Sequence, residues 1–276
     1  LNRGIESEES AYKFFNPKLS DLPNRENLRD IEKATKRILD AVKSQEKIVI
    51  YGDYDVDGVC SSSMLFDFLY RYLGAQVVPY IPSRFDEGYG LNEKALKQIK
   101  SEGTKLVITV DCGVRDGQLI KQQAGDGLDF LITDHHEPPE DKEDIKALLN
   151  NSVAVVHPSL SKNSDFKQIC ATTVVWYLIC ELIEVSKKED LLKSEINAEE
   201  YLDLVALGTV CDVMPLVEQN RIFLKEGLDR IHNTRNPGLK ELLMCSGVFS
   251  QEIKQYHIGF VVGPRLNAVG RLENAL

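Results

Sequence analysis

The sequence predicts an α/β fold in which helices flank a parallel β-sheet. Short apolar runs rich in β-branched residues recur between residues 48 and 156, and each is too short for a helix. Longer helix-compatible stretches separate the first four of these runs. Alternation of this kind is typical of a parallel sheet covered on both faces.

The individual elements follow from the apolar pattern in chain order. Residues 27–44 are predicted to form an amphipathic helix, because apolar side chains recur there at helical spacing. Strands are predicted at 48–51, 76–81, 106–110, 129–133 and 153–156. Helices are predicted between them at 59–73, 92–101 and 116–124.

The pattern changes to helical beyond residue 158. Helices are predicted at 171–185, 198–207 and 221–232, with a break at 209–215, and residues 263–271 are predicted to be a loop because of their Gly and Pro content. We therefore expect an N-terminal segment with its helix (1–45), a central domain (46–218) and a helical connector (219–276). The connector is expected to lead to a further domain that these 276 residues do not contain.

Composition excludes some classes of protein and leaves the partner open. The 43% hydrophobic and 28% charged content is ordinary for a globular protein, and no apolar run is long enough to predict a transmembrane helix. The net charge of −10 argues against a nucleic-acid partner, yet residues 219–276 carry eight basic and five acidic side chains. The six cysteines lack any Cys-x-x-Cys spacing, and the first residues lack a signal-peptide pattern, so we expect a cytoplasmic protein.

Three carboxylates follow the first predicted strand. Asp53, Asp55 and Asp57 occupy alternate positions in Tyr51-Gly-Asp-Tyr-Asp-Val-Asp-Gly58. Alternation on an extended backbone would project all three to one side, where their charges repel unless protons or cations neutralise them. A hard divalent cation is the simplest neutralising group.

Further polar side chains stand at the ends of other predicted strands. Asp111 follows 106–110, Asp134-His-His136 follows 129–133, and Asp212 lies in the break between two predicted helices. Each has an ordinary explanation alone, such as a helix N-cap for Asp111, a turn at Asp57-Gly58 or a structural histidine. The carboxyl ends of parallel strands meet at one edge, however, so the joint pattern predicts a ligand site.

The types of candidate ligand narrow the choice of metal ion. A mostly carboxylate site with one or two imidazoles suits Mn²⁺ or Mg²⁺ better than a thiolate-preferring zinc site. Enough carboxylates are present for two cations with one acid bridging them. Two such ions activate water and stabilise the leaving oxygen of a phosphoryl transfer, so the pattern predicts hydrolysis of a phosphate ester or anhydride.

Several segments together resemble a known family. They are Arg3-Gly-Ile5, Tyr51 to Gly58, Ile81-Pro-Ser-Arg84, Gly88-Tyr-Gly-Leu91, Thr109-Val-Asp-Cys-Gly113, Asp134-His-His136, Ala206-Leu-Gly-Thr-Val-Cys-Asp-Val-Met-Pro-Leu216 and Gly263-Pro-Arg-Leu-Asn-Ala-Val-Gly-Arg271. The sequence is similar to the DHH phosphoesterase superfamily and, within it, to the RecJ single-strand-specific exonucleases.

The resemblance implies a role for each candidate site residue. The implied metal ligands are Asp55, Asp57, Asp111, His135 and Asp212, with Asp111 as the bridge. Asp53 would orient a ligand from behind, and His136 would contact the scissile phosphate. The implied phosphate or nucleic-acid contacts are Arg84, Arg265, Asn267 and Arg271, and Arg265 would act in catalysis together with Asp111 and His136.

The resemblance also implies a function: a two-metal exonuclease that degrades single-stranded DNA from 5′ to 3′ in repair and recombination. Such enzymes continue into a DHH-associated domain and often an oligonucleotide-binding fold, so this chain alone is expected to bind DNA weakly. One alternative is a small-molecule or oligoribonucleotide phosphodiesterase or a pyrophosphatase, against which the segment 263–271 argues. A non-catalytic replication module is the other alternative, and the complete ligand set argues against it.

Overall fold

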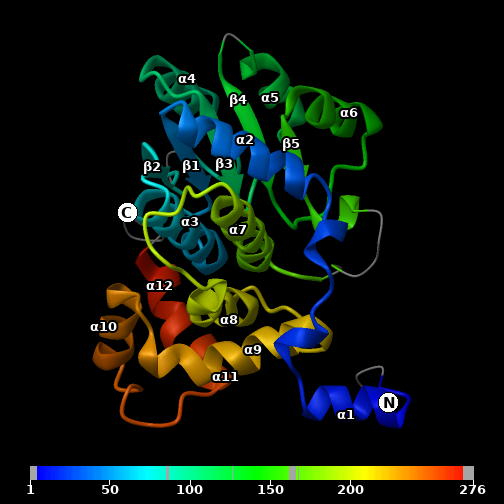
Figure 1. Cartoon of the computed structure of the whole chain (residues 1–276), viewed down its shortest axis with the longest axis vertical. Helices are drawn as coiled ribbons and strands as arrows, with labels where there is room; N and C mark the ends of the chain where they lie inside the picture. The colour runs from blue at the N-terminus through cyan, green and yellow to red at the C-terminus, as the bar shows by residue number, and fades with distance from the viewer. Residues whose placement is uncertain (1–4, 85–86, 126, 162–165, 167, 270–276) are drawn as a thin grey trace.

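The computed structural model describes residues 5–84, 87–125, 127–161, 166 and 168–269, and it confirms the predicted α/β class (Figure 1). In this part of the chain five strands form one parallel sheet in the order β2-β1-β3-β4-β5. The strands are β1 (Ile48–Gly52), β2 (Val77–Tyr80), β3 (Leu106–Val110), β4 (Asp129–Thr133) and β5 (Ala154–Val156). Because every strand runs the same way, the loops that follow them gather at one edge.

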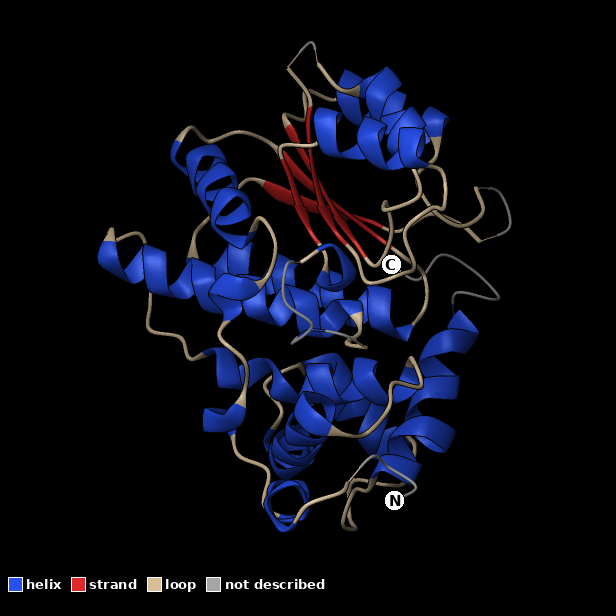
Figure 2. Ribbon diagram, turned by 90° about the vertical axis from the view of Figure 1, so that its right-hand side faces the viewer, coloured by secondary structure: helices blue, strands red, loops and turns tan. Residues whose placement is uncertain are grey.

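Helices cover both faces of the sheet (Figure 2). On β1, Ile48 and Ile50 pack in the cluster that includes α2 (Ile31–Lys43), α3 (Val56–Asp67) and α7 (Ala171–Lys188). The intervening Val49 and Tyr51 pack in the cluster of the opposite face. That face is covered by α4 (Glu93–Ser101), α5 (Gly117–Gln123) and α6 (Lys142–Asn151). Burial on both faces explains why the strands read as continuous apolar runs.

A second, helical layer packs beneath α3 and α7 (Figure 1). It comprises α8 (Leu202–Cys211), α9 (Glu218–Arg230), α10 (Pro237–Cys245), α11 (Gln255–His257) and α12 (Gly263–Val269), while α1 (Glu8–Phe15) lies beside it near the N-terminus. Among the described residues, no helix combines the length and apolar character needed to span a membrane.

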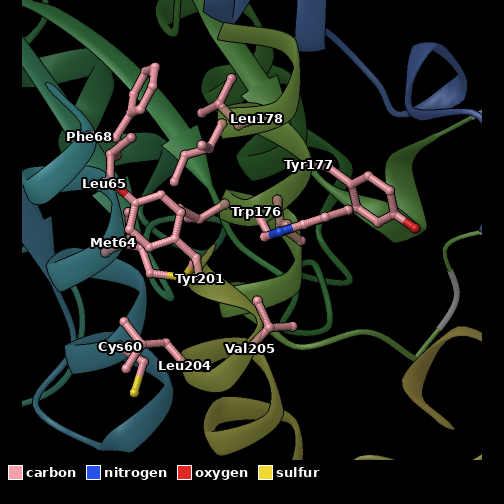
Figure 3. Close-up of a cluster of buried hydrophobic side chains, with 14 of the residues drawn as sticks. Cys60, Met64, Leu65, Phe68, Trp176, Tyr177, Leu178, Tyr201, Leu204 and Val205 are labelled. Carbon is pink, nitrogen blue, oxygen red and sulfur yellow. The ribbon is translucent and has the colours of Figure 1, made fainter. Parts of the chain in front are cut away.

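An apolar cluster joins α3, α7 and the start of α8 (Figure 3). Met64 and Phe68 are fully buried there, and the Trp176 indole donates a hydrogen bond to the Ala198 carbonyl at 2.8 Å. Trp176 also meets Phe223 of α9 edge to face, with ring centroids 5.1 Å apart. This packing fixes the positions of α3, α7 and α8 relative to one another, and all three contribute to the site.

The structure corrects several details of the predicted elements. Helices α1, α6, α10 and α11 were not predicted, and α8 continues to Cys211, into the predicted break at 209–215. Helix α3 begins at Val56, three residues earlier than expected, so Asp57-Gly58 lies in a helical turn. The predicted loop at 263–271 is wrong over Gly263–Val269, which forms α12.

The Gly and Pro content of this segment led to the wrong prediction of a loop, because both residues are compatible with a helix at these positions. A Cβ on Gly263 would lie 2.5 Å from the Cys211 sulfur, so glycine is needed for close packing. Pro264 follows the π-helical turn Ile258–Val262, which runs without a break into α12, and at such a turn the regular i→i−4 hydrogen-bond pattern is already interrupted.

Candidate metal centre

The acids that follow β1 lie on a strand-to-helix turn. The prediction of an extended backbone through Asp53, Asp55 and Asp57 is wrong, because α3 begins at Val56. Asp55 is the N-cap of α3, and its Oδ1 accepts hydrogen bonds from the backbone N–H groups of Asp57 (2.9 Å) and Gly58 (3.1 Å). A Cβ on Gly58 would lie 2.5 Å from the Asp53 carbonyl oxygen, so glycine lets the first turn of α3 pack against Asp53. The turn separates Asp57 from the other two carboxylates.

Asp111 lies directly after β3 in the left-handed region, with φ of 64°. Its carboxylate is buried, and its Oδ1 lies 3.3 Å from His135 Nε2. It does not cap the following helix, α5, whose N-cap is Asp116. The strained backbone therefore aims Asp111 at the site rather than at the next helix.

The loop after β4 is organised by Asp134, a residue for which the sequence predicted no separate role. Its Oδ1 accepts from the backbone N–H groups of His135 (2.7 Å) and His136 (3.1 Å), and it lies 2.8 Å from His136 Nδ1. Its Oδ2 accepts from the Val114 N–H at 2.9 Å. Burial opposes the charge, but the hydrogen bonds from His136 and from these amides lower the pKa of Asp134.

Two further side chains that the sequence did not single out hold His136. The Tyr89 hydroxyl lies 3.1 Å from His136 Nδ1, and the two rings meet edge to face. Behind the loop, the Ser159 N–H donates to His157 Nδ1, which leaves His157 Nε2–H to donate to the His136 carbonyl at 2.8 Å. Only the spacing Gly88-Tyr-Gly90 could have drawn attention to Tyr89, because its contact is not local in sequence.

The acids and histidines form overlapping groups that could hold metal ions. Among the described residues these groups are Asp53–Asp55–Asp111, Asp57–His135–Asp212 and Asp111–His135–His136, each with ligand atoms within 4.8 Å of one another. Asp111 and His135 each belong to two groups. Asp212, at the C-terminal end of α8, brings its Oδ2 to 3.5 Å from His135 Nε2.

Several of these atoms are buried without a hydrogen-bond partner. They are Asp53 Oδ1, Asp111 Oδ1, His135 Nε2 and Asp212 Oδ2. Buried polar atoms without partners are costly, and here they point into one small space. The donor set of carboxylate oxygens and imidazole nitrogen fits two hard divalent cations.

The metal-free electrostatics lead to the same conclusion. Burial, followed by repulsion from Asp55, raises the pKa of Asp53 to about 7. Burial, followed by repulsion from Asp57 and Asp55, raises the pKa of Asp212 to about 7 and that of Asp111 well above its usual range. Crowded buried carboxylates thus resist ionisation, and nearby cations would reverse that resistance.

A cavity of about 290 Å³ opens beside the first group. Its lining is Asp53, Tyr54, Asp55, Arg84, Tyr89, His136 and Asn267. The Arg84 guanidinium lies over the Tyr54 ring, 5.2 Å from its centroid. Asn267 is partly engaged, since its Oδ1 accepts from the Val56 N–H at 3.1 Å.

Arg265 and Arg271 are the other two arginines that the sequence predicted to contact phosphate. Arg265 is exposed outside the cavity lining, and its guanidinium donates to the Val261 carbonyl at 2.6 Å. Its contact with phosphate stays a prediction. Arg271 lies outside the described residues.

The site depends on Asp134, and its substitution should be destabilising. We expect Asp134→Asn to lower the free energy of unfolding by about 2–4 kcal/mol, because an amide NH₂ would then face buried donors. Urea unfolding measures this. The control is Asp141→Asn at the exposed N-cap of α6, where asparagine caps equally well. Equal stability of both variants would contradict the role assigned to Asp134.

Comparison with known proteins agrees with this geometry. Residues 47–209 match the model of the DHH family, N-terminal domain. The chain belongs to the DHH family. This match covers the sheet, the acids after β1, β3 and β4, and most of α8.

The chain is also similar to RecJ proteins. It is 40% identical over 276 residues to the single-stranded-DNA-specific exonuclease RecJ of Bacillus subtilis, covering 100% of this chain and 33% of that protein. A structure of exonuclease RecJ bound to manganese superposes with a TM-score of 0.77 at 32% identity, over 93% of this chain and 60% of that one.

The RecJ of Thermus thermophilus is similar as well, at 29% identity. Its complex with Mn²⁺ has a TM-score of 0.77 and its complex with Mg²⁺ one of 0.67, over 99% of this chain and 36% and 33% of the respective chains. This chain therefore spans about a third of the length of the first curated relative it matches.

Proposed function

We propose that this DHH-family chain carries the active site of a metal-dependent phosphodiesterase that degrades single-stranded DNA from 5′ to 3′ in repair and recombination. The observation that supports it most is the set of three ligand groups linked through Asp111 and His135, with unpartnered buried atoms in each group. The similarity to RecJ exonucleases supports the choice of substrate.

Two divalent cations, Mn²⁺ or Mg²⁺, would occupy the groups. Asp53, Asp55 and Asp111 would hold one ion, and Asp57, His135 and Asp212 the other. Asp111 Oδ1, 3.3 Å from His135 Nε2, supports a bridging role. The geometry also supports a direct ligand role for Asp53, in place of the supporting role that the sequence predicted.

The protein groups around the ions would bind and orient the substrate. When bound, the ions supply an activated water at neutral pH and neutralise charge on the phosphate. His136, held by Asp134 and Tyr89, presents its ring to the cavity, where it can donate a hydrogen bond to a phosphate oxygen. Arg84 also lines the cavity, where its forked guanidinium would suit a phosphate group.

The net charge of the chain supports weak DNA binding by this chain alone, and its cysteines support a cytoplasmic location. The net charge is −10, and phosphate contacts dominate the affinity of nucleic-acid binding. All six cysteines are free thiols, as is usual in a reducing compartment. Replication or repair proteins that bind the chain are left unspecified.

Product analysis tests the substrate and the polarity. With Mn²⁺, the 276-residue chain should release 5′-mononucleotides from the 5′ end of single-stranded DNA, and EDTA should abolish the reaction. Duplex DNA, cyclic dinucleotides and pyrophosphate serve as comparison substrates. Faster cleavage of the small molecules would favour the small-molecule phosphodiesterase or pyrophosphatase instead.

A further inference from the structure

The N-terminus of α7 lies against Asp57. The backbone N–H of Ala171 donates to Asp57 Oδ2 at 2.7 Å, and that of Thr172 donates to Oδ1 at 2.9 Å. The Thr172 hydroxyl also donates to Oδ1. Cys170, the N-cap of α7, makes no side-chain capping hydrogen bond, and a carboxylate from α3 instead satisfies the first amides of α7.

These contacts distinguish the two oxygens of the carboxylate. Oδ1 is engaged by two donors of one residue, the amide and the hydroxyl of Thr172. Oδ2 has a single amide donor and lies 3.8 Å from His135 Nε2, on the side of the ligand group. The orientation of Asp57 therefore leaves Oδ2 as the oxygen on the side of His135.

Gly208 of α8 closes the other side of this contact. A Cβ at Gly208 would lie 2.6 Å from Asp57 Oδ1 and would also overlap the Thr172 hydroxyl. Asp57, Thr172 and Gly208 are all buried, so the carboxylate has little room to rotate. Three helices thus meet at one carboxylate oxygen.

We infer that Thr172 is a positioning residue of the metal centre: its hydroxyl holds Asp57 Oδ1 and thereby turns Oδ2 toward the ion shared with His135 and Asp212. This inference rests on the proposed function. Thr172 is fully buried and donates to Asp57, a proposed ligand, so its effect on the reaction would pass through Asp57.

Metal titration of the metal-free 276-residue chain tests the inference. Thr172→Val keeps the size of the side chain and removes the hydroxyl, and we expect calorimetry to show Mn²⁺ binding about 10- to 100-fold weaker at one site. Thr172→Ser keeps the hydroxyl and should restore affinity to within about 3-fold of wild type, following the same principle. In the nuclease assay kcat should fall while KM for DNA stays unchanged.

The matched control is Thr173→Val, one position along the same helix. Thr173 is equally buried, and its hydroxyl lies 3.5 Å from the Cys170 sulfur rather than at Asp57. Thr173→Val should keep wild-type Mn²⁺ affinity. Gly208→Ala, which crowds Asp57 Oδ1 from the opposite side, should weaken the same site as Thr172→Val.

Two results would overturn the inference while leaving the proposed function intact. One is wild-type Mn²⁺ affinity in Thr172→Val, whatever its melting temperature. The other is equal weakening in Thr172→Val, Thr172→Ser and Thr173→Val, which would indicate a purely structural effect. If Thr172→Val does not fold, Thr172→Ala carries the same comparison. Absence of Mn²⁺ binding by the wild type would instead overturn both proposals.

Discussion

Asp111→Asn should lower Mn²⁺-dependent hydrolysis of single-stranded DNA about 1,000-fold, since losing about 4 kcal/mol of charge stabilisation corresponds to that factor. Asp111 belongs to two ligand groups, and its Oδ1 lies 3.3 Å from His135 Nε2. An asparagine keeps the shape of the side chain but removes the charge that would bridge two cations. Both ions should bind more weakly, and kcat should fall more than KM rises.

Single-turnover hydrolysis of end-labelled DNA and Mn²⁺ titration measure the two effects. Asp116→Asn is the matched control, because Asp116 lies on the same loop and accepts from the Leu91 N–H without joining a ligand group. An asparagine oxygen can accept the same hydrogen bond. Wild-type hydrolysis by Asp111→Asn would remove the basis of the two-metal proposal.

The stability of the metal-free protein should fall as the pH rises from about 4 to about 7. Asp53 and Asp212 have folded pKa values raised to about 7 from an ordinary value of 3.8. Between these limits the folded chain binds more protons than the unfolded chain, so raising the pH favours unfolding. Each group contributes at most about 4 kcal/mol, because one pKa unit corresponds to about 1.4 kcal/mol.

Bound Mn²⁺ should remove most of this dependence, because cations favour the ionised carboxylates. Urea unfolding in EDTA and in Mn²⁺, followed between pH 5 and pH 8, measures the effect. The variant Asp212→Asn has no charge to titrate at this position. In EDTA, its free energy of unfolding should therefore depend less steeply on pH than that of the wild type. A metal-free stability that rises over this range, or a slope unchanged in Asp212→Asn, would contradict the assigned cause.

Much of the sheet could be predicted because its signals are local. Residues 106–110 and 129–133 read as buried strands, and they form β3 and β4 with those bounds. The missed α6 starts at Lys142 after the N-cap Asp141, but its pattern is mostly polar, with only Ala147 and Leu148 buried. Local rules also failed at Gly263, because Cys211, against which it packs, lies far away in sequence.

Most of the candidate ligands could also be predicted from the sequence, because of the topology of the sheet. Parallel strands bring the residues that follow them to one edge, so Asp111 and His135 could be placed together from the sequence. Asp212 follows a helix, so the topology of the sheet did not place it, and its role as a ligand was implied by the family resemblance. The role of Asp53 could not be judged before its distance to Asp55 and Asp111 was known.

The sequence by itself determined the α/β class, the strand ends that carry the acids and the preference for a hard cation, because these depend on periodicity and residue chemistry. Only the tertiary structure decided how the candidate ligands group in space, that Asp134, Tyr89 and His157 hold His136, and that Thr172 donates to Asp57. The physical reason is the range of the interaction. Asp57 and Thr172 are 115 residues apart, and packing of α3 against α7 alone brings them into contact.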